Sequence, residues 1–112
     1  MAYELDGKTI ETDDYGYLND LTEWSEELVA VIAAADSVEM TERHMDVVKY
    51  LRDEHVNNGG NEPNERQIIK AMSKTWGDKV NSKDMYLLFP GTPSKQGRKW
   101  AGLPKSTRKG GY

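Results

Sequence analysis

Residues 88–112 read LFPGTPSKQGRKWAGLPKSTRKGGY, and this stretch contributes more to predicting the fold than any other. Thr92 followed by Pro93 is typical of a helix N-cap and the first helical residue. Gly102 is placed to end that helix, and the proline two residues later prevents its extension. The stretch therefore predicts a short helix, followed from Lys105 by a mobile basic tail.

The residues before this stretch predict a β-hairpin and four further helices. Asp6-Gly7 is a favoured two-residue turn, because both of its positions need positive φ. Apolar residues at helical spacing then predict helices over about 21–35, 42–56, 65–76 and 82–88. The residues expected to cap them are Asp20 or Asn19, Thr41, Asn64, and Asn81 or Ser82. The predicted fold class is mainly α: a small orthogonal helical bundle with an N-terminal β-hairpin, a helix-turn-helix-like element and a C-terminal arm.

Composition bounds the function. The 112 residues contain no cysteine, so the chain offers no disulfide, no thiolate metal ligand and no thiol nucleophile. The longest apolar run is far shorter than the ~20 residues of a membrane span, so no membrane partner is expected. Residues 1–63 hold sixteen acids and four bases, whereas residues 64–112 hold three acids and eleven bases. The basic half either meets an acidic partner or nucleic acid, or folds back on the acidic half.

The C-terminal stretch resembles the arm of the DsrC/TusE family of sulfur-relay proteins. The residues that match the family pattern are Leu88, Phe89, Pro90, Gly91, Pro93, Lys95, Gln96, Lys99, Ala101, Gly102, Leu103, Pro104, Lys105 and Thr107. The resemblance continues through the hairpin turn and the helices, so it covers essentially the whole chain. It implies one DsrC/TusE-like domain over residues 1–104 and a flexible basic tail over residues 105–112. We call residues 89–107 the arm.

In the family that this chain resembles, the arm carries sulfur on cysteine. Arg98 stands where the upstream cysteine would be, and Lys109 where the near-terminal one would be. Neither a guanidinium nor an ammonium group can hold a persulfide. The resemblance therefore predicts a cysteine-free, regulatory (RspA-like) member that is not an enzyme and needs no cofactor.

The expected role is docking on proteins of sulfur relay or dissimilatory sulfite reduction, as a cytoplasmic monomer. The predicted partner-binding residues are Lys95, Arg98, Lys99, Trp100, Lys105 and Lys109. The alternative interpretation of the basic residues is a solvated helix face. Trp100 either pins the arm to the rest of the domain or anchors a partner.

Two other functions stay open at this point. Arg66, Lys70 and Lys74 recur every four residues, so they form one basic stripe that could face DNA as part of a helix-turn-helix. The alternative is a solvated helix face. The third possibility is a sulfurtransferase of tRNA 2-thiouridine synthesis, suggested by the family name alone.

The remaining candidates are interpreted as structural. His44 and His55 are too far apart in a helix to bind one metal, so no metal site is predicted and both are taken as surface or boundary residues. Trp24, Trp76 and Tyr86 are expected in the core.

Overall fold

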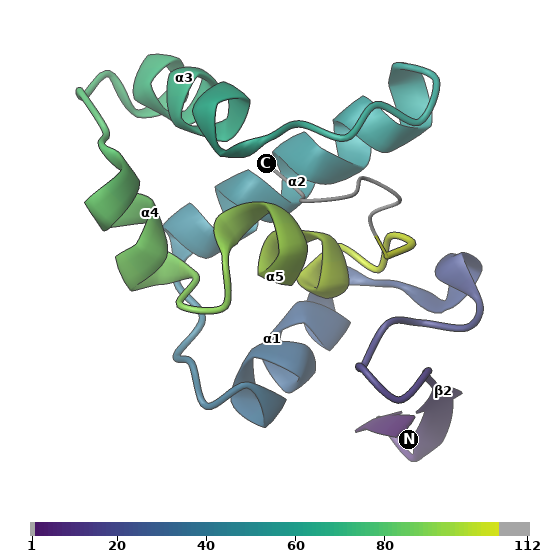
Figure 1. The fold of residues 1–112 in the computed structure, drawn as a ribbon. Helices are drawn as coiled ribbons and strands as arrows, with labels where there is room; N and C mark the ends of the chain where they lie inside the picture. Colours follow the sequence, from purple (N-terminus) through teal and green to yellow (C-terminus); the bar gives the residue numbers. More distant parts are fainter. Residues whose placement is uncertain (1, 106–112) are drawn as a thin grey trace.

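The computed structural model describes residues 2–105, which form a bundle of helices with a β-hairpin at one end (Figure 1). The elements in chain order are β1 Ala2–Leu5, β2 Lys8–Glu11, the 3-10 helix η1 Leu21–Glu23, α1 Glu26–Ala35, α2 Glu42–Asn57, α3 Glu65–Trp76, α4 Ser82–Leu88 and α5 Pro93–Trp100. This arrangement confirms the predicted fold class. None of the described helices is long and apolar enough to cross a membrane.

The hairpin forms as its turn predicts. Asp6 and Gly7 have φ values of 51° and 80°, and the two strands pair antiparallel with Tyr3 opposite Ile10. Tyr3 and Ile10 are buried, and the Tyr3 hydroxyl donates a hydrogen bond to the carbonyl of Gly16 at 2.9 Å. The hairpin thereby fixes the loop that follows it.

The first predicted helix is divided in two. Asp20 caps η1 by accepting from the Thr22 N–H at 2.9 Å, but the backbone then becomes extended at Trp24. Ser25 caps α1 by accepting from the Leu28 N–H at 3.3 Å. The continuous helix predicted from residue 21 is therefore wrong, because a second capping serine follows Trp24 and restarts the helix.

The predicted boundaries of α3 and α4 are confirmed by their caps. Asn64 and Gln67 bond each other's backbone at the start of α3, and Gly77 ends this helix at φ 67°. Asn81 caps α4 by accepting from the Asp84 N–H. Each of these three boundaries has a local sequence signal, and each lies where that signal predicts it.

α5 is the central helix of the bundle. It lies against α2, and it also contacts α1, α3 and α4 (Figure 1). Phe89, Trp100 and Leu103 of the arm belong to the hydrophobic core. Gly97 lies so close to α2 that a Cβ there would fall 2.7 Å from Leu51 Cδ1. The arm therefore contributes residues to the core as far as Leu103, and residues 106–112 lie outside the described residues.

Candidate functional site at the C-terminal arm

Asp36, which follows α1, binds three side chains of α5. Its carboxylate accepts hydrogen bonds from Lys99 Nζ at 2.6 Å, Trp100 Nε1 at 2.7 Å and Gln96 Nε2 at 3.0 Å. Burial raises the pKa of Asp36, but the hydrogen bonds from these three side chains outweigh it and hold the pKa below its ordinary value. The basic arm thus folds back on the acidic half of the chain through Lys99, which was one of the two alternatives.

Both ends of α5 are bonded by side chains of other elements. Glu65 of α3 accepts a hydrogen bond from the Ser94 N–H at 2.6 Å. After the helix, Arg52 of α2 donates to the Ala101 carbonyl at 2.6 Å, and its guanidinium stacks 4.0 Å from the Trp24 ring. Because the end groups of a short helix otherwise lack partners, these bonds hold α5 in a single position.

Arg98, which the resemblance places at the upstream cysteine position, is buried. Only 2% of the surface of this residue is exposed, and Nε donates to the Pro104 carbonyl at 3.0 Å. The guanidinium therefore holds the chain after α5 against the helix. Arg98 does not lie on the surface, where it was expected to meet a partner, because its side chain packs inward. Lys109, which the resemblance places at the near-terminal cysteine position, lies outside the described residues.

Trp100 is the central aromatic residue of the arm. It is fully buried, it stacks on His44 with ring centroids 5.2 Å apart, and it meets Phe89 edge-on at 4.9 Å. Of its two predicted roles, pinning the arm is the one that this buried position fits. Anchoring a partner does not fit, because no part of the indole is exposed.

His44 is buried, which corrects its interpretation as a surface or boundary residue. Nδ1 accepts from the Thr41 N–H at 3.0 Å, so the ring is neutral with its proton on Nε2, which lies 2.7 Å from the Leu88 carbonyl that accepts it. Burial lowers the pKa of His44 more than the bond to Leu88 raises it. Sequence reasoning missed this residue because a capping box normally has Glu or Gln at the third helical position.

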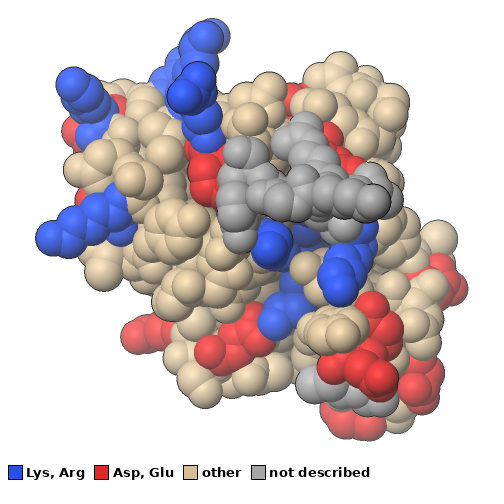
Figure 2. Space-filling view, viewed as in Figure 1, with Lys and Arg blue, Asp and Glu red and all other residues tan. Residues whose placement is uncertain are grey.

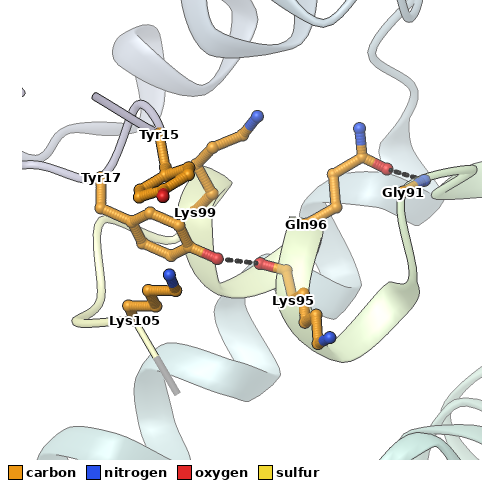
Figure 3. A pocket seen from close by; sticks show the side chains of 7 residues that line it. All are labelled: Tyr15, Tyr17, Gly91, Lys95, Gln96, Lys99 and Lys105. Carbon is orange, nitrogen blue, oxygen red and sulfur yellow. Dashed lines mark hydrogen bonds between the residues drawn. The ribbon is translucent and has the colours of Figure 1, made fainter. Parts of the chain in front are cut away.

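A groove of about 230 Å³ runs along the exposed side of α5. Figure 3 labels its seven lining residues, which comprise two tyrosines, three lysines, Gly91 and Gln96. Lys95 and Lys105 are exposed, whereas Lys99 is held by Asp36. The ammonium group of Lys105 lies 4.1 Å from the centroid of the Tyr15 ring. This groove brings together three of the six predicted partner-binding residues.

Sequence reasoning missed the tyrosines of this groove. Tyr15 and Tyr17 lie between the hairpin and the helices, and the sequence indicated no role for them beside the arm. In the structure the Tyr17 hydroxyl donates to the Lys95 carbonyl at 3.2 Å, across 78 residues of sequence (Figure 3). An aromatic residue on either side of a glycine was the available signal, but nothing local connects it to α5.

The residues of the predicted DNA-binding stripe lie elsewhere. Arg66, Lys70 and Lys74 are exposed on α3 and form no ion pair with the residues that the structure describes. Lys70 and Lys74 border a second hollow of about 320 Å³, together with Tyr50 of α2. Figure 2 shows basic side chains projecting over α3 and α4 and others over α5, while acidic ones gather near the hairpin and α1.

Two of the three aromatic residues expected in the core pack against it. Trp24 and Trp76 are partly buried, and Trp76 Nε1 donates to Asp46 at 2.7 Å. Tyr86 is 41% exposed on α4, so its interpretation as a core residue is wrong, because Met85 takes the buried position. Among residues 2–105, no group of three or more His, Asp or Glu side chains could hold a metal ion.

These features define a small helical protein in which the C-terminal arm is built into the core and presents a cationic groove. The family model described as DsrC like protein matches residues 4–108, so the chain belongs to the DsrC-like family. It is 42% identical over 106 residues to the sulfurtransferase TusE of Pectobacterium atrosepticum, covering 94% of this chain and 96% of that relative.

Solved structures agree with this assignment. The solution structure of DsrC from Allochromatium vinosum superposes with a TM-score of 0.85 at 39% identity, covering 96% of each chain. The oxidized gamma-subunit of the dissimilatory sulfite reductase (DsrC) from Archaeoglobus fulgidus gives 0.85 at 32% identity, covering 97% of this chain and 99% of that one. The chain is thus a sulfur-relay family protein.

The comparisons correct one prediction. We expected that the chain is not an enzyme, and this expectation is wrong, because relatives at 41–42% identity over almost their whole length are named sulfurtransferases. The reasoning judged activity from one missing residue type, whereas relatives that match almost the whole chain carry the name sulfurtransferase.

Proposed function

We propose that this chain is a docking and regulatory member of the sulfur-relay family. It binds relay proteins or a sulfite reductase at its arm, in the cytoplasm and as a monomer, and the transferred sulfur stays on a partner's cysteine. The observation that carries the proposal is the buried Arg98, which fills the position of a family cysteine beside an exposed cationic groove.

The chemistry supports this division of labour. A sulfane sulfur needs a thiolate acceptor, and the chain has no cysteine. The guanidinium of Arg98 is engaged with the Pro104 carbonyl. Exposed Lys95 and Lys105 instead offer charge to a partner surface. Binding the same partners as a cysteine-bearing relative would make this chain a competitor, and hence a regulator, of sulfur delivery.

Affinity capture from the native cytosol tests the docking. We expect the full chain to recover a sulfurtransferase complex or a sulfite reductase, and the double variant Lys95→Glu/Lys105→Glu to lose it. The matched control is Lys79→Glu/Lys83→Glu, which reverses two exposed charges outside the groove. Equal recovery by all three proteins would remove the arm from the interaction.

Mass spectrometry tests where the sulfur resides. After incubation with a sulfane donor and a captured partner, we expect the partner to gain the mass of a sulfur atom and this chain to keep its own mass. A sulfur adduct on this chain would overturn the proposed division of labour.

A second candidate function is DNA binding by α3. It rests on one observation, the exposed stripe of Arg66, Lys70 and Lys74. The loop between α2 and α3 is longer than the about 3–4-residue turn of a compact helix-turn-helix, and the net charge of −4 opposes DNA binding. Salt-sensitive retardation of genomic fragments that Lys70→Glu weakens would support this function, and no retardation at low salt would end it.

A further inference from the structure

The groove along α5 has the composition of a site for a carboxylate-bearing chain. Among the lining residues that the structure describes, lysines supply all of the charged groups and none carries a carboxylate. Lys105 makes no ion pair with the residues that the structure describes, and its exposed ammonium group lies over the Tyr15 ring at the rim. Exposed Lys95 supplies a second positive charge on the same helix face as the groove.

The aromatic side of the groove is rigid before anything binds. Asp13 Oδ1 accepts from the backbone N–H of Tyr15 at 2.8 Å and of Tyr17 at 3.0 Å. The Tyr17 hydroxyl is tied to the Lys95 carbonyl, while Tyr15 is 67% exposed (Figure 3). An exposed aromatic ring on a fixed loop beside cations is a usual composition for the energetic centre of a protein interface, because little conformational freedom is lost on binding.

We propose that this groove receives an acidic segment of a partner protein, with carboxylates at Lys95 and Lys105 and an apolar side chain against Tyr15. This inference rests on the proposed docking function, and it names the chemistry of the partner. It also assigns a role to Tyr15 and Tyr17, which the sequence did not connect to the arm.

A peptide fits this surface better than a nucleic acid. Asp13 and Asp14 lie in the same loop as Tyr15 and Tyr17, and Asp36 is bonded to Lys99 of α5. These carboxylates lie near the groove without lining it, and they would repel a continuous polyphosphate backbone that follows it. A peptide with a few glutamates can place its charges on the two lysines and turn neutral side chains towards the acidic neighbours.

NMR titration of the ¹⁵N-labelled full chain with a short glutamate-rich peptide containing one phenylalanine tests the proposal. We expect the amide signals of Tyr15, Tyr17 and Gly91 to move, and the same peptide with glutamine for glutamate to have no effect. Tyr15→Ala and Lys105→Gln should each weaken binding by about threefold or more. Lys83→Gln on α4 is the matched control and should leave the affinity unchanged.

Three outcomes would overturn the inference. They are no binding at millimolar peptide, signal changes confined to α3, or tighter binding of a DNA duplex in the same groove. The capture experiment separates this inference from the proposed function. If relay partners are captured through the arm but the peptide does not bind, the inference of an acidic segment is wrong and the proposed docking function is retained. If the peptide binds but no relay partner is captured, the proposed function fails and the groove stands.

Discussion

Asp36 shows how a single residue determines the position of the arm. The three side chains that donate to its carboxylate follow it by 60, 63 and 64 residues. Its carboxylate is mostly buried, and two of the donors are neutral, so hydrogen bonds as well as charge hold it in the ionised form. Removing the charge leaves Lys99 partly buried without its anion, which costs more than losing a pair at the surface.

Asp36→Asn should therefore lower the free energy of unfolding by about 2 kcal/mol, measured by urea denaturation at neutral pH. Asp78→Asn is the control, since Asp78 is 68% exposed and pairs with Arg43 at 3.5 Å, and it should cost less than about 0.5 kcal/mol. Because the pKa of Asp36 is lowered, its contribution is complete above the ordinary carboxyl pKa and is lost as the pH falls through the folded-state value. Equal costs for the two variants would contradict this role of Asp36.

His44 should make stability depend on pH in a different window. Protonation of Nδ1 would turn the acceptor of the Thr41 N–H into a donor, and the pKa is lowered in the folded state. The unfolded chain therefore binds the proton more tightly, so stability is constant above about pH 6.5 and falls as the pH decreases below it. Urea midpoints measured between pH 7.5 and 5 test this, and His44→Phe should remove the dependence while keeping a ring against Trp100. The same slope in that variant would assign it to another group.

At the scale of the element, α5 begins with a strained residue. Thr92 precedes Pro93 with φ 83° and ψ 117°, and its side chain makes no capping hydrogen bond. The sequence predicted the boundary correctly, but the capping geometry it implied is wrong. A β-branched residue at this φ is destabilised, because its Cβ crowds the backbone. The contacts of α5 with Asp36 and Glu65 hold the backbone there.

Thr92→Gly should raise the free energy of unfolding by about 1 kcal/mol, because glycine adopts this backbone conformation without crowding. Thr75→Gly, at an exposed position inside α3, is the same chemical change in a relaxed helix. It should lower the free energy of unfolding by about 0.3 kcal/mol, the difference between the helix propensities of threonine and glycine. Opposite signs for the two substitutions are the expected result, and destabilisation at both positions would show that Thr92 is not strained.

Boundaries of elements could be read from the sequence wherever a local pair of residues determines them. Asn64 with Gln67, Gly77 and Asp6-Gly7 each act within about one turn of the chain. The division of the first helix at Trp24 could not be read from the sequence, because Ser25 competes with Asp20 as a cap. Trp24 is held outside the helix by donating to the Trp100 carbonyl at 2.9 Å, 76 residues away.

At the scale of the whole molecule, the resemblance predicted the family and the fold. The sequence did not predict which side chains of the arm are exposed to a partner and which are buried. Four of the predicted partner-binding residues belong to α5: Lys95, Arg98, Lys99 and Trp100. Only Lys95 is exposed, because Asp36, His44 and the chain after α5 cover the side of the helix that carries the other three. Tyr15 and Tyr17 join the groove through the hairpin loop. The contacts with Asp36 and Tyr17 join residues that lie sixty or more positions apart, and such contacts leave no periodic signal in a single sequence.

This architecture makes a prediction about truncation. A chain that ends at Lys95 loses Gln96, Lys99 and Trp100, the three donors to Asp36, and also the buried Leu103. Each large side chain removed from the core costs about 2 kcal/mol or more, so losing an indole and a leucine together is comparable to the whole stability of a small domain. This truncated chain should therefore show no cooperative thermal transition by circular dichroism.

The matched truncation ends at Lys105 and keeps every contact named above. It should keep a cooperative transition, and with it the groove along α5. The pair of truncations separates a core helix from a detachable arm, because a detachable arm would leave both proteins equally stable. If the chain ending at Lys95 unfolds, its failure to bind a partner reports unfolding and not a missing docking site. A docking role of the arm therefore has to be tested by substitutions at exposed Lys95, Lys105 and Tyr15, which leave the core intact.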